Sequence, residues 1–243
     1  MAHATMNMSI RVLIAAIIEI TYAVLTRTWL REQLNGVDLE LAVTAARLVT
    51  VVAYWMLFRE LIRSRVSGAG SVKRSLVLIG VVVALTIPFF FQGWSPGGGL
   101  GTAVVFALTS VVVGLREELL YRAVLLNLLE PKIGTFNALL LSTGLFVVYH
   151  YGALPVTALA ITEVVCLSML LGLIYVKSGS LIAVIVFHSV YDAVWFFGPF
   201  LANPLPDIWR PAFLLPALVL VFLGTWRFGQ TQSVRPAAAA LRD

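Results

Sequence analysis

The sequence predicts an all-α fold, a polytopic transmembrane bundle of about eight helices. Its 243 residues are 60% hydrophobic and 12% charged, with a mean hydropathy of +0.96. Soluble domains carry about 25% charged residues, so this composition is typical of an integral membrane protein. No polar segment is long enough to fold alone, which favours a single helical domain.

Long apolar runs separated by polar or Gly/Pro-containing connections define the expected spans. We expect helices over approximately residues 9–28, 39–58, 75–92, 102–129, 135–151, 156–176, 181–197 and 212–228. The first run lacks a strongly basic flank and a convincing cleavage site. We therefore interpret it as a retained helix rather than a signal peptide.

The fourth span, residues 102–129, is longer than a membrane requires. At 1.5 Å per residue it would extend roughly 42 Å, whereas a hydrocarbon core is about 30 Å thick. We expect this helix to tilt, to kink at Gly114 or to extend beyond the bilayer. The sequence Glu130-Pro131-Lys132 is expected to end it.

The net charge of +5 comes from cations that cluster in loops, so it indicates membrane topology rather than a nucleic-acid partner. The loop at residues 59–74 carries five Lys or Arg side chains, which is typical of a cytoplasmic loop. It predicts a multi-pass protein of the cell membrane with both termini in the cytoplasm. The single cysteine, Cys166, excludes an intramolecular disulfide framework and a cysteine zinc cluster.

The segment Arg116–Arg122 places four charged side chains in seven residues of an otherwise apolar run. Each charge near the centre of a membrane helix costs about 2.5–3.5 kcal/mol, so four cost on the order of 10 kcal/mol and mark a candidate functional site. Glu118 and Arg122 are spaced to form an ion pair on one helix face. Glu117 is turned about 100° away and is the freer carboxylate, a candidate general base. Arg116 is expected only to balance residual charge.

Two of the three histidines, His150 and His188, lie in apolar spans further along the chain. His150 follows Phe146 by four residues and His188 precedes Asp192 by four, so each pair shares a helix face. Two imidazoles near Glu117 would complete a site that activates water for hydrolysis.

Three ordered motifs in this region resemble those of the CPBP family of intramembrane proteases (CAAX protease and bacteriocin-processing, or Abi). The motifs are Glu117-Glu118-x-x-x-Arg122, Phe146-x-x-x-His150 and His188-x-x-x-Asp192. The best-known members of this family are the Ras-converting CAAX prenyl endopeptidases. The resemblance implies a protease-like catalytic core at residues 101–200, with an intramembrane catalytic cavity formed by the fourth, fifth and seventh spans. Helices and a basic loop at 1–100 precede this core, and a last helix and a polar tail at 201–243 follow it.

The resemblance also implies a role for each motif residue. Glu117 corresponds to the catalytic glutamate, which activates the attacking water together with His150. Glu118 and Arg122 correspond to a supporting pair that fixes the helix. Phe146 is expected to pack and to shape the site.

His188 corresponds to the second histidine, which stabilises the oxyanion or positions the site. Asp192 stands where the prenyl endopeptidases have an asparagine, whose amide can donate to the oxyanion. An ionised aspartate cannot donate, so we expect Asp192 to orient His188 or to be protonated. Glu117, His150 and His188 would be the ligands of a zinc ion with an open position. We favour a mechanism without a metal or other cofactor, because the sequence has no HExxH motif.

The resulting hypothesis is an intramembrane endopeptidase that hydrolyses a peptide bond in a membrane-associated peptide or protein. Its expected partners are that substrate and the lipid bilayer, with no nucleic acid. The alternative is a non-proteolytic immunity or scaffolding factor that binds a peptide or a partner protease, and a proton-coupled transporter is a third. Outside the motifs, Glu19 and Arg47 are expected to form an ion pair, and Glu163 to line the same cavity.

Overall fold

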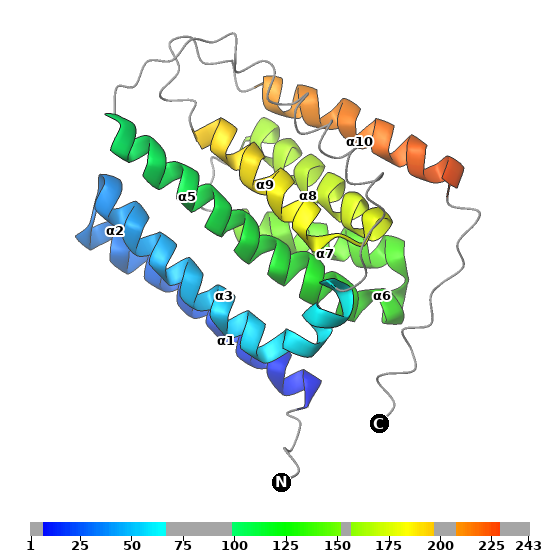
Figure 1. Cartoon of the computed structure of the whole chain (residues 1–243), viewed down its shortest axis with the longest axis horizontal. Coiled ribbons are helices and arrows are strands. Elements are labelled where there is room, and N and C mark those ends of the chain that lie inside the picture. The colour runs from blue at the N-terminus through cyan, green and yellow to red at the C-terminus, as the bar shows by residue number, and fades with distance from the viewer. Residues whose placement is uncertain (1–6, 67–98, 152–156, 197–207, 229–243) are drawn as a thin grey trace.

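The computed structural model of the chain describes residues 7–66, 99–151, 157–196 and 208–228, which form a bundle of helices with no β-strand among them (Figure 1). The all-α prediction is therefore confirmed. The third expected span, residues 75–92, lies outside the described residues. The elements in chain order are α1 (Met8–Val24), η1 (Leu25–Trp29), α2 (Leu30–Gln33), α3 (Gly36–Val66), α5 (Gly99–Glu118), η2 (Leu119–Leu126), α6 (Asn127–Ile133), α7 (Thr135–His150), α8 (Ala158–Ser178), α9 (Leu181–Phe196) and α10 (Trp209–Phe228).

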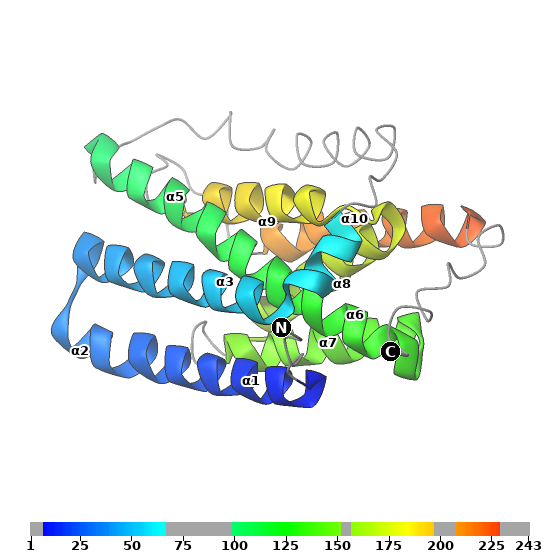
Figure 2. The same ribbon diagram turned by 60° about the horizontal axis from the view of Figure 1, so that its bottom comes forward.

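Helix α5 lies in the middle of the bundle. On one side it packs against α3, which lies between α5 and α1 (Figure 2), and on the other side it packs most extensively against α9. Helix α8 contacts α7, α9 and α10, and α10 lies at the edge of the bundle (Figure 1). A residue on α5 can therefore contact the amino-terminal helices or the later helices, depending on the direction in which its side chain points.

Local sequence accounts for where several helices begin and end. The side chain of Asn7 accepts a hydrogen bond from the Ser9 amide at the start of α1, and Thr157 caps α8 in the same way through the Ala160 amide. Gly179 ends α8 in the left-handed conformation, with φ of 66°, a geometry that glycine adopts without a Cβ clash.

The long fourth span shows no kink at Gly114, which was one of three expected alternatives: α5 continues directly into η2, a π-helical segment, and then into α6. The helix ends slightly later than the expected Glu130-Pro131-Lys132, because Pro131 lies inside α6 and the chain turns at Gly134, with φ of 77°. Proline removes one backbone hydrogen bond without ending this helix, whereas the positive φ of a glycine ends it.

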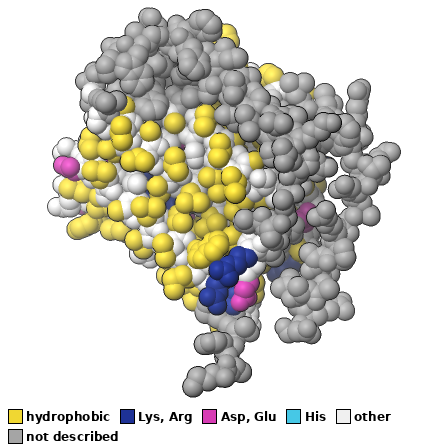
Figure 3. Space-filling view, in the orientation of Figure 1, with side chains coloured by type: hydrophobic (Ala, Val, Ile, Leu, Met, Phe, Trp, Pro, Cys, Tyr) yellow, Lys and Arg dark blue, Asp and Glu magenta, His cyan; other side chains and the backbone are white. Residues whose placement is uncertain are grey.

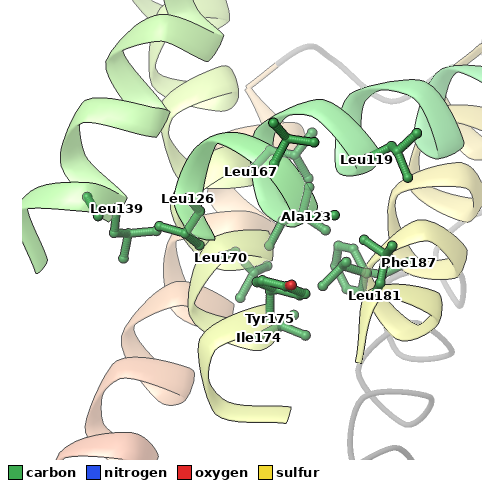
Figure 4. Packing of buried hydrophobic residues seen from close by; sticks show 14 of the residues in the cluster. Leu119, Ala123, Leu126, Leu139, Leu167, Leu170, Ile174, Tyr175, Leu181 and Phe187 are labelled. Atoms are coloured by element: carbon green, nitrogen blue, oxygen red, sulfur yellow. The ribbon is translucent and has the colours of Figure 1, made fainter. Parts of the chain in front are cut away.

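The described hydrophobic core supports η2 from the side of the later helices. Leu119, Ala123 and Leu126 of η2 pack in one cluster with Leu170 of α8 and Phe187 of α9 (Figure 4). Ala123 and Leu170 are completely buried. In a lipid bilayer the alternative to this packing is contact with lipid tails, so close van der Waals contact among these side chains holds the charged segment in place among the helices.

The outer surface of the bundle is apolar. Hydrophobic side chains cover most of the described surface on the face seen in Figure 3, and residues such as Met56 and Val49 are about 70% exposed (71% and 69%). Three described helical stretches are long and apolar enough to cross a membrane: Met8–Gln33, Gly36–Arg63 and Ala158–Ser178. An exposed apolar surface of this extent fits a lipid environment, and the chain is a membrane protein.

Candidate active site

The side chains of the three sequence motifs come together where α5 and η2 pass α7 and α9. Glu117 and Glu118 end α5, and Arg122 lies on η2. His150 is the last residue of α7, and His188 and Asp192 lie one turn apart on α9. Residues that are as much as 75 positions apart in sequence thus contribute to one cluster of charged and imidazole groups, all within a membrane protein.

Glu117 lies between the two histidines. Its Oε2 atom is 3.8 Å from Nε2 of His150 and 3.8 Å from Nε2 of His188. Both separations exceed the length of a hydrogen bond, and this oxygen has no hydrogen-bond partner among the described residues. The Glu117 side chain is only 6% exposed, so one buried carboxylate oxygen faces two imidazoles without a direct bond to either.

Glu118 has closer partners than its neighbour. Its Oε2 is 3.2 Å from Nε of Arg122, so the predicted ion pair is present, although this oxygen makes no hydrogen bond among the described residues. Its Oε1 accepts a hydrogen bond of 2.7 Å from Nδ1 of His188, a contact that the sequence analysis did not predict. Arg122 in turn donates to the backbone oxygen of Ser168 at 3.0 Å. Glu118 therefore connects η2 and α9 and fixes the orientation of the His188 ring.

His150 is oriented by the helix that carries it. Its Nδ1 is 2.8 Å from the backbone oxygen of Phe146, and the two rings are 4.4 Å apart. A carbonyl oxygen can only accept, so Nδ1 is the donor and Nε2 points toward Glu117. Phe146 is buried and its ring also lies 5.0 Å from the guanidinium carbon of Arg122, as expected for a residue that shapes the site by packing.

Asp192 and His150 are the most accessible members of the cluster. The Asp192 side chain is 16% exposed and its Oδ2 is 3.6 Å from Nε2 of His188, while the His150 side chain is 20% exposed. The ring of His188 therefore has Glu118 at one nitrogen and Glu117 and Asp192 near the other. The hydrogen bond that orients the ring comes from Glu118, and Asp192 lies slightly beyond hydrogen-bond distance.

A glycine lets α5 and α9 approach closely next to the cluster. A Cβ atom at Gly114 would lie 2.5 Å from Oγ and 3.0 Å from the backbone nitrogen of Ser189, and 3.1 Å from the backbone oxygen of Ile185. Ser189 follows His188, and Gly114 lies one helical turn before Glu118. Gly114 thus allows close packing of α5 and α9 rather than a kink in α5, one of the three alternatives expected for this span.

The prediction that Arg116 only balances residual charge is wrong, because this side chain connects several helices. Its side chain is 1% exposed, and its Nη2 donates to Oε1 of Glu19 on α1 at 2.5 Å. The expected Glu19–Arg47 ion pair is not formed, because Arg47 pairs with Glu40 at 2.8 Å. Residue spacing alone does not identify these partners, because the Glu19–Arg116 contact joins distant helices that only the tertiary fold brings together.

Glu163, the other acidic residue noted on the later spans, lies beside the site. Its Oε1 accepts a hydrogen bond of 2.7 Å from the Tyr191 hydroxyl, and Tyr191 precedes Asp192 on α9. Glu163 therefore contacts the helix that carries His188 and Asp192 through the hydroxyl of Tyr191.

The spacing of the Glu117, His150 and His188 side chains differs from the spacing of ligands around zinc. Two ligands of a tetrahedral zinc ion are roughly 3.3 Å apart, whereas Glu117 Oε2 is 3.8 Å from each histidine nitrogen. Within the described part of the chain, no group of three or more His, Cys, Asp or Glu side chains is arranged to hold a metal ion. The side chains as they stand in this structure do not fit a zinc ion.

Residues 99–194 match the family model described as type II CAAX prenyl endopeptidase Rce1-like. The matched segment begins at α5 and ends within α9, so it contains all three motifs and every residue of the cluster. The resemblance to the CPBP and CAAX protease family is thereby confirmed, and a CAAX protease-like activity is supported at the level of the family. No curated protein and no solved structure matches the chain.

Proposed function

We propose that this protein is an intramembrane endopeptidase that hydrolyses a peptide bond in a membrane-associated peptide or protein, using water activated by Glu117 and His150. The observation that carries the proposal is the pair of 3.8 Å separations around Glu117 Oε2, a buried carboxylate oxygen without a hydrogen-bond partner among the described residues. The match to the prenyl endopeptidase family supports the same reaction class.

The orientation of His150 supports a role for this residue in accepting a proton. Because its Nδ1 donates to the Phe146 backbone oxygen, the neutral ring presents a lone pair at Nε2 toward Glu117. Both groups are then acceptors, and a water molecule within reach of both donates one hydrogen to each. The oxygen lone pairs of that water remain available for attack on a peptide carbonyl, and either acceptor takes the proton that is released.

His188 is positioned to stabilise the tetrahedral intermediate. Its Nδ1 donates to Glu118, and its Nε2 lies near two further carboxyl groups, those of Glu117 and Asp192. Three acidic neighbours favour a ring that donates from both nitrogens, and an N–H at Nε2 would stabilise an oxyanion that develops beside Glu117. Asp192 lies 3.6 Å from the same nitrogen, where its polar group can assist at the oxyanion.

We propose further that the reaction proceeds without a metal and that the protein lies in the cell membrane with both termini in the cytoplasm. The five Lys and Arg side chains of residues 59–74 support this orientation; the first three of them, Arg59, Arg63 and Arg65, lie at the end of α3 rather than in a loop as predicted. If zinc is used instead, Glu117, His150 and His188 are the residues that would hold it. Cleavage that persists after treatment with a zinc chelator supports the metal-free proposal, and cleavage that stops and returns only with added zinc contradicts it.

The test is a mass-spectrometric comparison of the termini of membrane proteins in cells that contain the native protein or Glu117→Gln. Termini that depend on the native protein should disappear in the variant, since loss of a general base lowers turnover by about 10²–10⁴-fold. Glu60→Gln is the matched control, because it makes the same chemical change at a side chain that is 65% exposed on α3.

Undiminished cleavage by a well-folded Glu117→Gln protein would overturn the mechanism. The alternative, a non-proteolytic immunity or scaffolding factor that binds a peptide or partner protease, makes a different prediction. It requires that Glu117→Gln retains the full protective effect of the native protein and that no terminus depends on Glu117.

A further inference from the structure

The residues immediately before the two proposed water-activating groups are hydrogen-bonded to each other. Arg116 precedes Glu117 on α5, and Tyr149 precedes His150 on α7. The Nη1 atom of Arg116 donates to the Tyr149 hydroxyl at 2.9 Å. A direct side-chain bridge thus connects the two helices at the place where they present Glu117 and His150.

Arg116 is held rigidly at its end of this bridge. In addition to the ion pair with Glu19 on α1, its Nε donates to Oγ1 of Thr50 on α3 at 3.0 Å, and its guanidinium lies 4.1 Å from the ring centre of Tyr22. The side chain is 1% exposed. Bonds in three directions to buried or partly buried partners restrict a guanidinium to one orientation, and two of the partners belong to helices outside the matched segment 99–194.

Tyr149 is held equally at the other end. Arg27 of η1 lies 4.9 Å from the centre of its ring and Arg116 lies 5.1 Å from it, so the ring is in contact with two cations. Arg27 also donates to the backbone oxygens of Tyr149 and, at 2.8 Å, of Tyr151, the two neighbours of His150. These carbonyls at the end of α7 lack a following helical turn, and a cation there stabilises the helix end.

We infer that the Arg116–Tyr149 bridge is a positioning pair that sets the separation between Glu117 and His150. These two side chains have no direct hydrogen bond to each other, so their 3.8 Å separation depends on the placement of their helices. The bridge acts at the adjacent residues, and α1, η1 and α3 hold both of its ends. The amino-terminal helices are therefore part of the support of the catalytic site. This inference rests on the proposed function.

The experiment removes one hydroxyl. Tyr149→Phe keeps the ring that packs between the two arginines and deletes the acceptor of the Arg116 bond. Tyr22→Phe is the matched control, because its ring also lies against Arg116 while its hydroxyl makes no hydrogen bond to Arg116 in the described structure. The substrate is a peptide that spans a Glu117-dependent cleavage position. Tyr149→Phe should lower kcat by about 10–100-fold, as expected when the Glu117 and His150 side chains are misplaced by about 1 Å, and KM should stay within about twofold of the native value. The control should retain its kcat.

A second measurement needs no substrate. The protein labelled with ¹⁵N-histidine is examined by NMR in lipid nanodiscs at one pH, with the His150 signals assigned from His150→Gln. Tyr149→Phe should move the Nε2 resonance of His150 in the native background, because the interaction of this nitrogen with the Glu117 carboxylate depends on distance. In a Glu117→Gln background the same substitution should move the resonance much less, since the carboxylate charge through which the bridge acts has been removed.

The outcomes separate this inference from the proposed function. If Glu117-dependent cleavage exists but Tyr149→Phe has native kcat and a native His150 Nε2 resonance, the positioning inference is wrong and the proposed function stands. If no terminus depends on Glu117 but Tyr149→Phe moves the His150 resonance only when Glu117 is present, the proposed function fails and the bridge still positions the two side chains. A shift of equal size in both backgrounds shows a general loss of structure and overturns the inference.

Discussion

Glu117 and Glu118 are adjacent on one helix, yet their surroundings differ in a way that separates support from chemistry. Glu118, Arg122 and His188 form a closed side of the site: each side chain is at most 2% exposed, and their contacts are 2.7 and 3.2 Å long. Glu117, His150 and Asp192 form an open side, where the side chains are 6–20% exposed and the separations from the nearest ionisable groups are 3.6–3.8 Å.

This difference indicates that the Glu117 carboxylate, rather than that of Glu118, is available to a reactant. Groups in close ion-pair or hydrogen-bond contact with charged partners hold the fold, whereas groups separated by slightly more than a hydrogen bond can accept a water molecule or a substrate atom. The rotation of about 100° between successive residues of a helix is sufficient to place Glu117 and Glu118 in these different environments. Substitutions on the closed side should therefore lower the free energy of unfolding, whereas substitutions on the open side should mainly lower turnover.

The largest expected effect that tests this division comes from Glu118→Gln. The substitution removes the charge that pairs with Arg122 and leaves a buried cation, which costs about 3–5 kcal/mol when one partner of a buried pair is lost. The His188 ring loses a charge-assisted bond at the same time, so turnover should fall as well. The free energy of unfolding in detergent and the turnover with a peptide substrate measure both effects.

Glu117→Gln is the matched comparison, because it makes the same chemical change at the neighbouring residue. It should lower turnover, while the free energy of unfolding stays within about 1 kcal/mol of the native value. If the two variants lose stability equally, the distinction between a closed and an open side is wrong.

The sequence predicted part of this division. The i,i+4 spacing of Glu118 and Arg122 predicted their ion pair, which the structure contains, because spacing within one helix determines which side chains are neighbours. The three motifs also predicted that Glu117, His150 and His188 come together. The bond from His188 to Glu118 and the partners of Arg116 were not predictable, because they depend on the rotation and separation of helices that lie far apart in the sequence.

A smaller effect is expected from Gly114→Ala, which forces α5 and α9 apart at the closed side. The added Cβ would meet the backbone of Ser189 and Ile185, which cannot rotate away, so the helices must separate at a cost of about 1–3 kcal/mol. The displacement moves His188 relative to Glu118, and turnover should fall about 10-fold. Thermal unfolding and turnover of the purified protein measure the two consequences.

Gly172→Ala is a suitable control for this prediction. A Cβ at Gly172 would meet only the side chain of Leu139, with Cδ1 at 2.1 Å, and the end of a leucine can move to another rotamer. Turnover should therefore remain within about twofold of the native value, since α8 carries none of the proposed catalytic side chains. A Gly114→Ala protein with native turnover and stability would show that α5 and α9 can separate without consequence for the site.

The smallest effect is expected from Asp192→Asn, on the open side. Asp192 lies 3.6 Å from His188, and that ring is already oriented by the 2.7 Å bond to Glu118, so the charge of Asp192 is not needed to hold it. Asparagine has the same size and its amide can donate to an oxyanion, as the resemblance to the prenyl endopeptidases implies for this position. Turnover should stay within about threefold of the native value, whereas Asp192→Ala, which removes the polar group altogether, should lower it by about 10-fold. A loss of more than about 30-fold in Asp192→Asn would mean that the aspartate charge itself takes part in the reaction, and the boundary of the closed side would then have to include Asp192.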